Sequence, residues 1–139
     1  MGCKYNGYCS DMTRTIFVDS IPNNIKPVYD MVLENQKRVI NELCEGKIIK
    51  DLALMVESNF SLKRHNVLHA CGHGVGLECH EMPKILTKNM HAIKENMVLA
   101  IEPGAYVAGN FGVRIEDTVW VKKNSCTELT KSEKNYIII

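Results

Sequence analysis

Four short segments each place one carboxylate or imidazole group in an unusual setting. Asp11 lies within the β-branched run SDMTRT, and His73 lies between glycines in GHGVG. Glu102 directly follows the apolar run 98–101, and Glu116 lies in the strand-like segment RIED. Taken singly, each residue has an ordinary explanation, such as a solvent-facing strand acid, a loop histidine or a turn residue.

Taken together, these residue types predict a metal centre. Acids at the ends of buried runs are costly unless something neutralises them. One histidine with several carboxylates suits a hard or borderline cation such as manganese or cobalt. Glu102 and Glu116 lie fourteen residues apart, so a hairpin turning at residues 109–110 would bring both to one point. Such a cluster is suited to hydrolysis by a metal-activated hydroxide.

Strands and turns that would position these residues are indicated by composition and spacing. Asn6-Gly7 is typical of a type I′ turn, which predicts a hairpin over residues 4–9 whose second strand continues to Val18. Gly109-Asn110 predicts a second hairpin. Further strands are expected over residues 98–101, 105–107, 113–115, 118–121 and 136–139.

Two segments show helical spacing instead. The first has apolar residues at Val28, Val32, Val39 and Leu43. This spacing predicts a helix that Gly46 ends through its left-handed backbone. A shorter helix is expected over about residues 50–60, with Leu52, Met55 and Val56 facing inward. Two helices with a mixed set of strands predict an α+β fold.

Composition excludes several classes of protein. With 139 residues, 45% of them hydrophobic, the chain is long enough for one domain with a real core. A net charge of +1 and the absence of a long uncharged stretch argue against a nucleic-acid or membrane partner, and we expect a cytoplasmic protein. The six cysteines contain no CxxC pair and nothing indicates secretion, so we expect reduced thiols.

Four motifs resemble one known family in order and spacing. GYCSDMTRT, HACGHGVGLECHEMP, NMVLAIEPGAY and GVRIEDTV are similar to the proline-specific metallopeptidases, aminopeptidase P and prolidase, which share the pita-bread fold. The resemblance extends over residues 1–139, and HEMP in place of an HEEP-like segment favours the proline-directed branch over methionine aminopeptidase. It implies a metal-dependent Xaa-Pro peptidase that hydrolyses the bond preceding proline in peptides or dipeptides.

The resemblance also implies a ligand set for the metal. Asp11 and Glu116 match carboxylates that bridge two divalent ions, manganese or cobalt in our expectation. His73 and Glu102 match the residues that complete the coordination of one of these ions.

Four further residues match positions around the substrate. His80 is similar to a histidine that contacts the substrate and stabilises the tetrahedral intermediate, and His69 to one that lines the pocket. Tyr106 and Arg114 match residues that orient the metal ligands without touching the metal.

The family pattern departs from this sequence at its start. The family's first metal ligand, an aspartate, would fall immediately before Met1. We therefore expect residues 1–139 to be a catalytic pita-bread domain that lacks its N-terminal portion and holds one ion where the family holds two. Exposed sheet edge and helix surface would favour self-association or pairing with a missing N-terminal half. Two functions stay open: an Xaa-Pro peptidase, or a non-catalytic remnant of the fold that binds peptide or protein.

Overall fold

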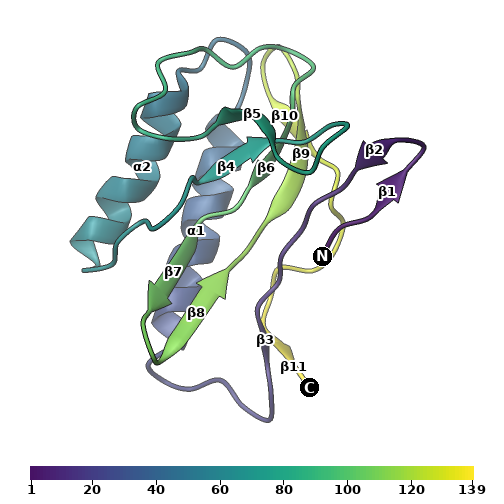
Figure 1. The fold of residues 1–139 in the computed structure, drawn as a ribbon. Helices are drawn as coiled ribbons and strands as arrows, with labels where there is room; N and C mark the ends of the chain where they lie inside the picture. The colour runs from purple at the N-terminus through teal and green to yellow at the C-terminus, as the bar shows by residue number, and fades with distance from the viewer.

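Two helices and eleven mainly antiparallel strands form the structure, a computed structural model that describes residues 1–139 (Figure 1). The helices are α1 (Lys26–Glu42) and α2 (Ile49–Leu62). The strands are β1 (Lys4–Tyr5), β2 (Tyr8–Cys9), β3 (Ile16–Phe17), β4 (Gly72–Gly74), β5 (Glu81–Lys84), β6 (Val98–Ile101), β7 (Gly104–Val107), β8 (Phe111–Arg114), β9 (Asp117–Val121), β10 (Cys126–Glu128) and β11 (Ile137–Ile138). The α+β class predicted from the sequence is confirmed.

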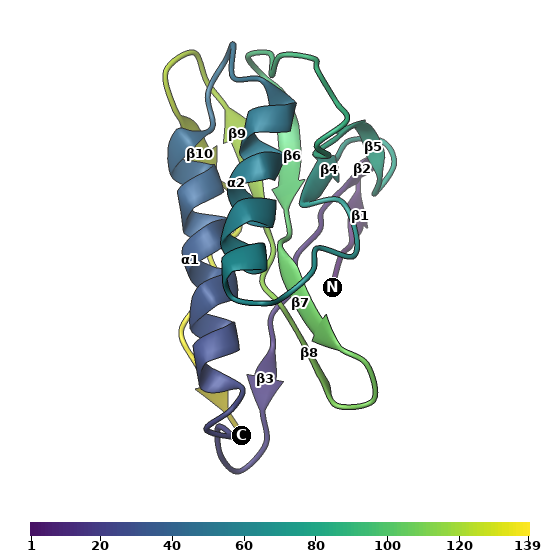
Figure 2. The same cartoon turned by 90° about the vertical axis from the view of Figure 1, so that its left-hand side faces the viewer.

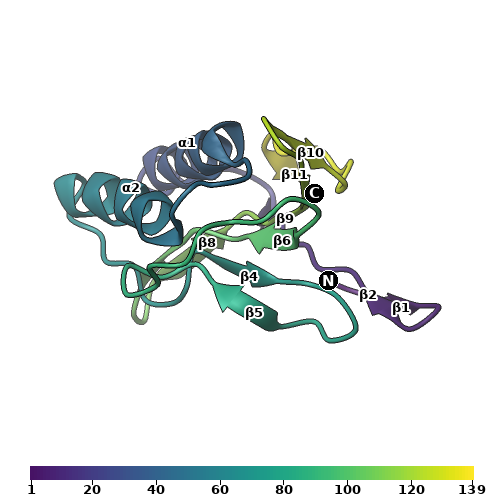
Figure 3. The ribbon, with the colours of Figure 1, turned by 90° about the horizontal axis from the view of Figure 1, so that it is seen from above.

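A five-stranded antiparallel sheet in the order β10-β9-β6-β4-β5 forms the centre of the molecule. Both helices lie on one face of this sheet, as Figures 2 and 3 show. The apolar stripes of the helices join residues of β6 and β9 in a single core of 23 buried residues. Leu52 and Val56 of α2 are buried there as expected, whereas Met55 is only partly buried. Neither helix combines the length and apolar composition that a membrane span requires.

Both predicted hairpins are present. Asn6 and Gly7 have positive φ angles of 48° and 89°, which match the right-handed twist of β1 and β2. Gly109, with a φ of 72°, lies in the connection between β7 and β8. The β7–β8 hairpin continues from β6 and leads back into β9 (Figure 1), so residues 102 and 116 lie where it joins the sheet.

The prediction that the second strand of the first hairpin continues to Val18 is wrong. Strand β2 ends at Cys9, and only Ile16–Phe17 form a later strand, β3, which pairs in parallel with β11. Between them Thr13 makes an isolated antiparallel bridge to Glu116. Beyond Cys9 the N–H groups of Ser10 and Met12 still donate to the carbonyls of Cys3 and Met1, and at Thr13 the segment crosses to the sheet.

The end of the first helix also differs from its prediction. Helix α1 ends at Glu42, and its C-cap residue Leu43 is extended rather than left-handed. Leu43 is fully buried, which requires the chain to turn inward before it reaches Gly46. Gly46 has a φ of 84°, but its N–H donates to the Ile93 carbonyl and does not cap the helix.

Strand β4 was not predicted, although it supplies the central histidine. Its sequence Gly-His-Gly lacks a strand-like pattern of side chains, yet it pairs with β5 on one side and β6 on the other. A Cβ at Gly72 would lie 2.2 Å from the Ala100 carbonyl oxygen, and one at Gly74 would lie 2.4 Å from that of Met82. These glycines therefore permit close approach of neighbouring backbones.

Candidate metal centre

His73 is the middle residue of β4 and is 3% exposed. Its Nδ1 lies 2.9 Å from the Gly74 carbonyl oxygen. A carbonyl oxygen can only accept a hydrogen bond, so the neutral ring carries its proton on Nδ1 and presents the lone pair of Nε2. This is the arrangement that a metal-binding imidazole requires.

Three carboxylates surround His73 Nε2. The nearest is Glu102, with Oε1 at 3.5 Å, followed by Asp11 Oδ2 at 3.8 Å and Glu116 Oε1 at 3.9 Å. Asp11 comes from the segment after β2, Glu102 from the residue after β6, and Glu116 from the residue before β9. The structure thus brings together all four residues that the sequence indicated as metal ligands.

The centre contains more acceptors than donors. His73 Nε2 and Glu116 Oε1 are buried and have no hydrogen-bond partner. Burial raises the pKa of Glu116, and the nearby Asp11 and Glu102 carboxylates raise it further, although a hydrogen bond from Thr13 opposes this shift. Buried acceptors without donors are unfavourable, and a divalent cation would satisfy them together. The donor set of oxygens and one imidazole nitrogen fits such an ion.

Thr13 and Arg114 hold two of the carboxylates in place. Thr13 Oγ1 donates to Glu116 Oε2 over 2.5 Å, which turns Oε1 toward His73. Arg114 Nε donates to Thr13 Oγ1 over 3.3 Å and lies 4.0 Å from Glu102 Oε2. The sequence assigned no role to Thr13, although its place two residues after Asp11, on the same side of an extended chain, was a usable signal.

The remaining predicted residues lie around this centre. The ring of His80 is exposed and packs edge to face on His73, with ring centroids 4.3 Å apart. His69 Nδ1 lies 2.8 Å from the Ala70 carbonyl, so Nε2 accepts from the Tyr106 hydroxyl at 2.9 Å. Arg114 Nη1 donates to the same hydroxyl over 3.4 Å. Arg114 therefore connects the hydrogen-bonded pair of His69 and Tyr106 to the metal centre.

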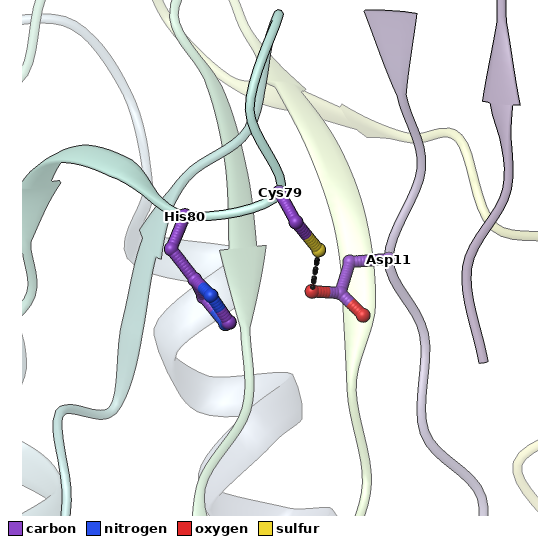
Figure 4. A group of neighbouring side chains, drawn as sticks. All are labelled: Asp11, Cys79 and His80. Carbon is purple, nitrogen blue, oxygen red and sulfur yellow. Dashed lines mark hydrogen bonds between the residues drawn. The ribbon is translucent and has the colours of Figure 1, made fainter.

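Cys79 is a further residue at the centre that the sequence interpretation missed. Its thiol donates to Asp11 Oδ2 over 3.0 Å (Figure 4). This hydrogen bond, together with burial and the negative charge of Asp11, raises the pKa of the Cys79 thiol to about 11. Its position next to His80 in the sequence could have indicated that Cys79 lies near the centre. All six cysteines are free, as expected.

A buried ion pair anchors the segment that carries Asp11 to β9. Arg14 Nη2 lies 2.6 Å from Asp117 Oδ1, and Lys134 Nζ lies 2.8 Å from Asp117 Oδ2. Gln36 of α1 donates to Oδ2 over 2.7 Å. Burial by itself raises the pKa of Asp117, but the hydrogen bonds from Lys134 and Arg14 outweigh it and hold that pKa below its ordinary value.

Comparison with known proteins places this centre in a family. The sequence pattern of metallopeptidase family M24 matches residues 1–123. The chain belongs to metallopeptidase family M24. Members of this family use divalent metals, which agrees with the donor set around His73.

Relatives of this M24 chain include proline peptidases. The Xaa-Pro dipeptidase of Pyrococcus furiosus is 40% identical over 141 residues, covering 99% of this chain and 40% of that protein. The crystal structure of X-Pro aminopeptidase from Thermotoga maritima has a TM-score of 0.95 and 34% identity, covering 99% of this chain and 39% of that one. The prolidase from Pyrococcus horikoshii gives a TM-score of 0.94 and 39% identity, with coverages of 98% and 40%.

These likenesses confirm the pita-bread fold and the resemblance to proline-specific peptidases that the four motifs indicated. The M24 chain spans about 40% of the length of the curated relatives that it matches.

Proposed function

We propose that this M24 chain carries the metal-binding part of an Xaa-Pro peptidase, which hydrolyses the bond preceding proline in peptides or dipeptides. The observation that carries the proposal is the lone pair of His73 Nε2, buried without a partner and surrounded by the carboxylates of Asp11, Glu102 and Glu116. A structural role for this cluster would leave His73 Nε2 and Glu116 Oε1 buried without the donors that they need.

In this proposal, His73, Glu102, Asp11 and Glu116 hold one divalent ion. Three carboxylates with a single imidazole favour manganese or cobalt over softer metals. Held by these four residues, such an ion would supply the activation of water and the polarisation of a scissile carbonyl that peptide hydrolysis requires. Thr13 keeps one oxygen of Glu116 directed at the ion, because its hydroxyl occupies the other oxygen.

Residues beside the ion act on the substrate. His80 is exposed and packs on His73, so it can hydrogen-bond the carbonyl oxygen as negative charge develops there. His69 and Tyr106 form a polar wall whose hydrogen bonds set the ring orientation of His69. Arg114 supports this wall through the Tyr106 hydroxyl and lies beside Glu102, with Nε 4.0 Å from Oε2.

The surface beside the centre supports a further proposal about partners. Tyr5 and Tyr8 of the first hairpin and Leu77 are 76%, 64% and 58% exposed. The hairpin projects from the side of the sheet opposite the helices (Figure 3). A neighbouring cleft of about 470 Å³ includes Asp11 and Leu129 in its lining. We propose that this surface packs against the N-terminal portion of the fold, which lies outside the segment of the relatives that the chain matches, or against a second copy of the chain.

Fusion to a relative provides the test of function. The upstream part of the P. furiosus Xaa-Pro dipeptidase would be joined to residues 1–139, and hydrolysis of an Xaa-Pro dipeptide and a longer Xaa-Pro peptide would be followed with Mn²⁺. We expect hydrolysis that His73→Ala abolishes together with metal binding. We expect His80→Ala to lower turnover and to leave the metal content nearly unchanged. Loss of metal in His80→Ala would show that His80 is a ligand, and a metal-loaded fusion without turnover would refute the peptidase proposal.

A second candidate is a non-catalytic module that binds peptide or protein, which the exposed Tyr5, Tyr8 and Leu77 beside the metal centre favour. It predicts that the metal-loaded fusion binds a proline-containing peptide without cleaving it. Sedimentation of the chain alone and with the upstream part would show whether it pairs with itself or with that part.

A further inference from the structure

We propose that Asp11, Cys79 and His80 form a second cation site, selective for thiophilic divalent ions such as Zn²⁺ or Cd²⁺. The site lies beside the candidate metal centre and shares Asp11 with it. It rests on the proposed function only through that shared carboxylate, because neither Cys79 nor His80 belongs to the ligand set of the first ion.

The geometry of the three side chains supports a common ligand. One donor atom from each residue lies within 4.8 Å of the other two. Figure 4 shows the thiol of Cys79 directed at the Asp11 carboxylate and the imidazole of the adjacent His80 extending along the same side. Bond lengths of about 2.0–2.3 Å place the ligand atoms of a tetrahedral zinc roughly 3.5 Å apart. The three ligand atoms must therefore move closer together to bind zinc. Because His80 is exposed, its side chain can rotate to shorten these distances.

The two sites differ in the metals that they favour. The first offers three carboxylates and one imidazole, whereas the second offers sulfur, nitrogen and a single carboxylate. Thiolate ligands select softer ions such as zinc and cadmium over manganese. In the metal-free protein the Cys79 thiol donates its proton to Asp11 in a hydrogen bond. When the metal binds, the S–H bond breaks, the proton is released to solvent and the sulfur binds the metal as a thiolate.

Asp11 is placed to serve both ions. Its Oδ2 lies 3.8 Å from His73 Nε2 on one side and 3.0 Å from Cys79 Sγ on the other. The rings of His73 and His80 contact each other, so the two sites are adjacent. His73 Nε2 and Glu116 Oε1 are buried without a hydrogen-bond partner, so unsatisfied acceptors lie close to Asp11. Cys126, in contrast, donates to the Ile40 carbonyl and faces no such cluster.

Cadmium titration of the whole chain tests this site. The reduced protein, saturated with Mn²⁺, would be titrated with Cd²⁺ while the near-ultraviolet thiolate-to-cadmium charge-transfer band is recorded. We expect a band that saturates at one Cd²⁺ per chain, is lost in Cys79→Ser and is unchanged in Cys44→Ser, a matched control that removes a thiol elsewhere. His80→Ala should keep the band and weaken Cd²⁺ binding by about tenfold or more, since even supporting residues contribute that much to metal affinity.

Two further measurements separate this site from the proposed metal centre. His73→Ala should lose Mn²⁺ binding but keep the cadmium band. In the unaltered chain, Cd²⁺ should protect Cys79 from iodoacetamide, a readout by peptide mapping that needs no variant. Absence of the band, a band that survives Cys79→Ser, or alkylation of Cys79 at saturating Cd²⁺ would each overturn the second site, whatever the result for Mn²⁺.

Discussion

Replacing Asp117 by Asn should destabilise the fold strongly, because Asp117 is fully buried among positive groups. Arg14 and Lys134 each lie within 2.8 Å of one of its oxygens, and Gln36 donates a third hydrogen bond. Each ion pair has a gross attraction of about 6 kcal/mol at an effective dielectric constant of about 20. Lys134 keeps Glu128 as a partner after the substitution, so the net cost arises mainly from Arg14.

The side chain of Arg14 is only 5% exposed, so the substitution leaves a buried charge without its partner. Breaking a buried pair in this way costs about 3–5 kcal/mol. Arg14 still donates to the carbonyls of residues 13, 116, 132 and 133, which favours the lower end of that range. We therefore expect a loss of about 3 kcal/mol in the free energy of unfolding.

Urea denaturation followed by circular dichroism would measure this loss, with a chelator present so that metal binding contributes nothing. Glu42→Gln is the matched control, since it removes the exposed partner of Lys47 and should hardly move the midpoint. The pKa of Asp117 is lowered, so its contribution is present above the ordinary carboxyl pKa and is lost as pH falls through the lowered value. Asp117→Asn should accordingly show less acid sensitivity. A variant within about 1 kcal/mol of the original protein would refute the reasoning.

Three more outcomes follow from the site and its surroundings. Thr13→Val should weaken Mn²⁺ binding about 10- to 100-fold in calorimetry, because Glu116 loses the hydrogen bond that fixes its carboxylate. The control Thr127→Val should leave Mn²⁺ affinity unchanged, and equal affinities of the two variants would show that Thr13 does not support the site. Gly72→Ala should lower the unfolding free energy by about 1–3 kcal/mol, because its Cβ would lie 2.2 Å from a carbonyl oxygen of β6; unchanged urea midpoints would contradict this. Burial raises the pKa of Cys71 to about 12, so iodoacetamide should modify Cys71 far more slowly than exposed Cys3 at pH 8, and similar rates would show that Cys71 is accessible.

Local chemistry explains which elements could be predicted from the sequence. Asn6-Gly7 specifies a turn through its backbone preferences alone, and its hairpin was predicted correctly. The apolar spacing of α1 was equally informative, since the helix buries one stripe. Strand β4 carried no such pattern, because its two glycines serve the approach of neighbouring strands. The end of α1 was mispredicted because the burial of Leu43, a tertiary requirement, determines where the chain turns.

The candidate ligands could be selected from the sequence because Glu102 follows an apolar run, Asp11 and Glu116 lie in strand-like segments and His73 lies between glycines. The family resemblance placed them in one set. Their supporting contacts were not predictable in the same way. Thr13 and Glu116 are 103 residues apart, as are Arg14 and Asp117, so only the fold reveals these pairs. Cys79 belongs to none of the roles that the resemblance implied, and its contact with Asp11 required coordinates.

Titration of the chain with Mn²⁺, while hydrolysis of an Xaa-Pro peptide is followed, tests the central claim most directly. His73 and the three carboxylates around it provide one complete site for a hard cation. We therefore predict one tightly bound Mn²⁺ per chain, lost in His73→Ala and in Glu102→Gln. We also predict little or no hydrolysis by the chain alone, since the two-ion chemistry needs ligands for a second manganese beyond the shared carboxylates. Absence of Mn²⁺ binding, or binding that survives both substitutions, would contradict the metal centre, and two bound Mn²⁺ with robust turnover would contradict the ligand count.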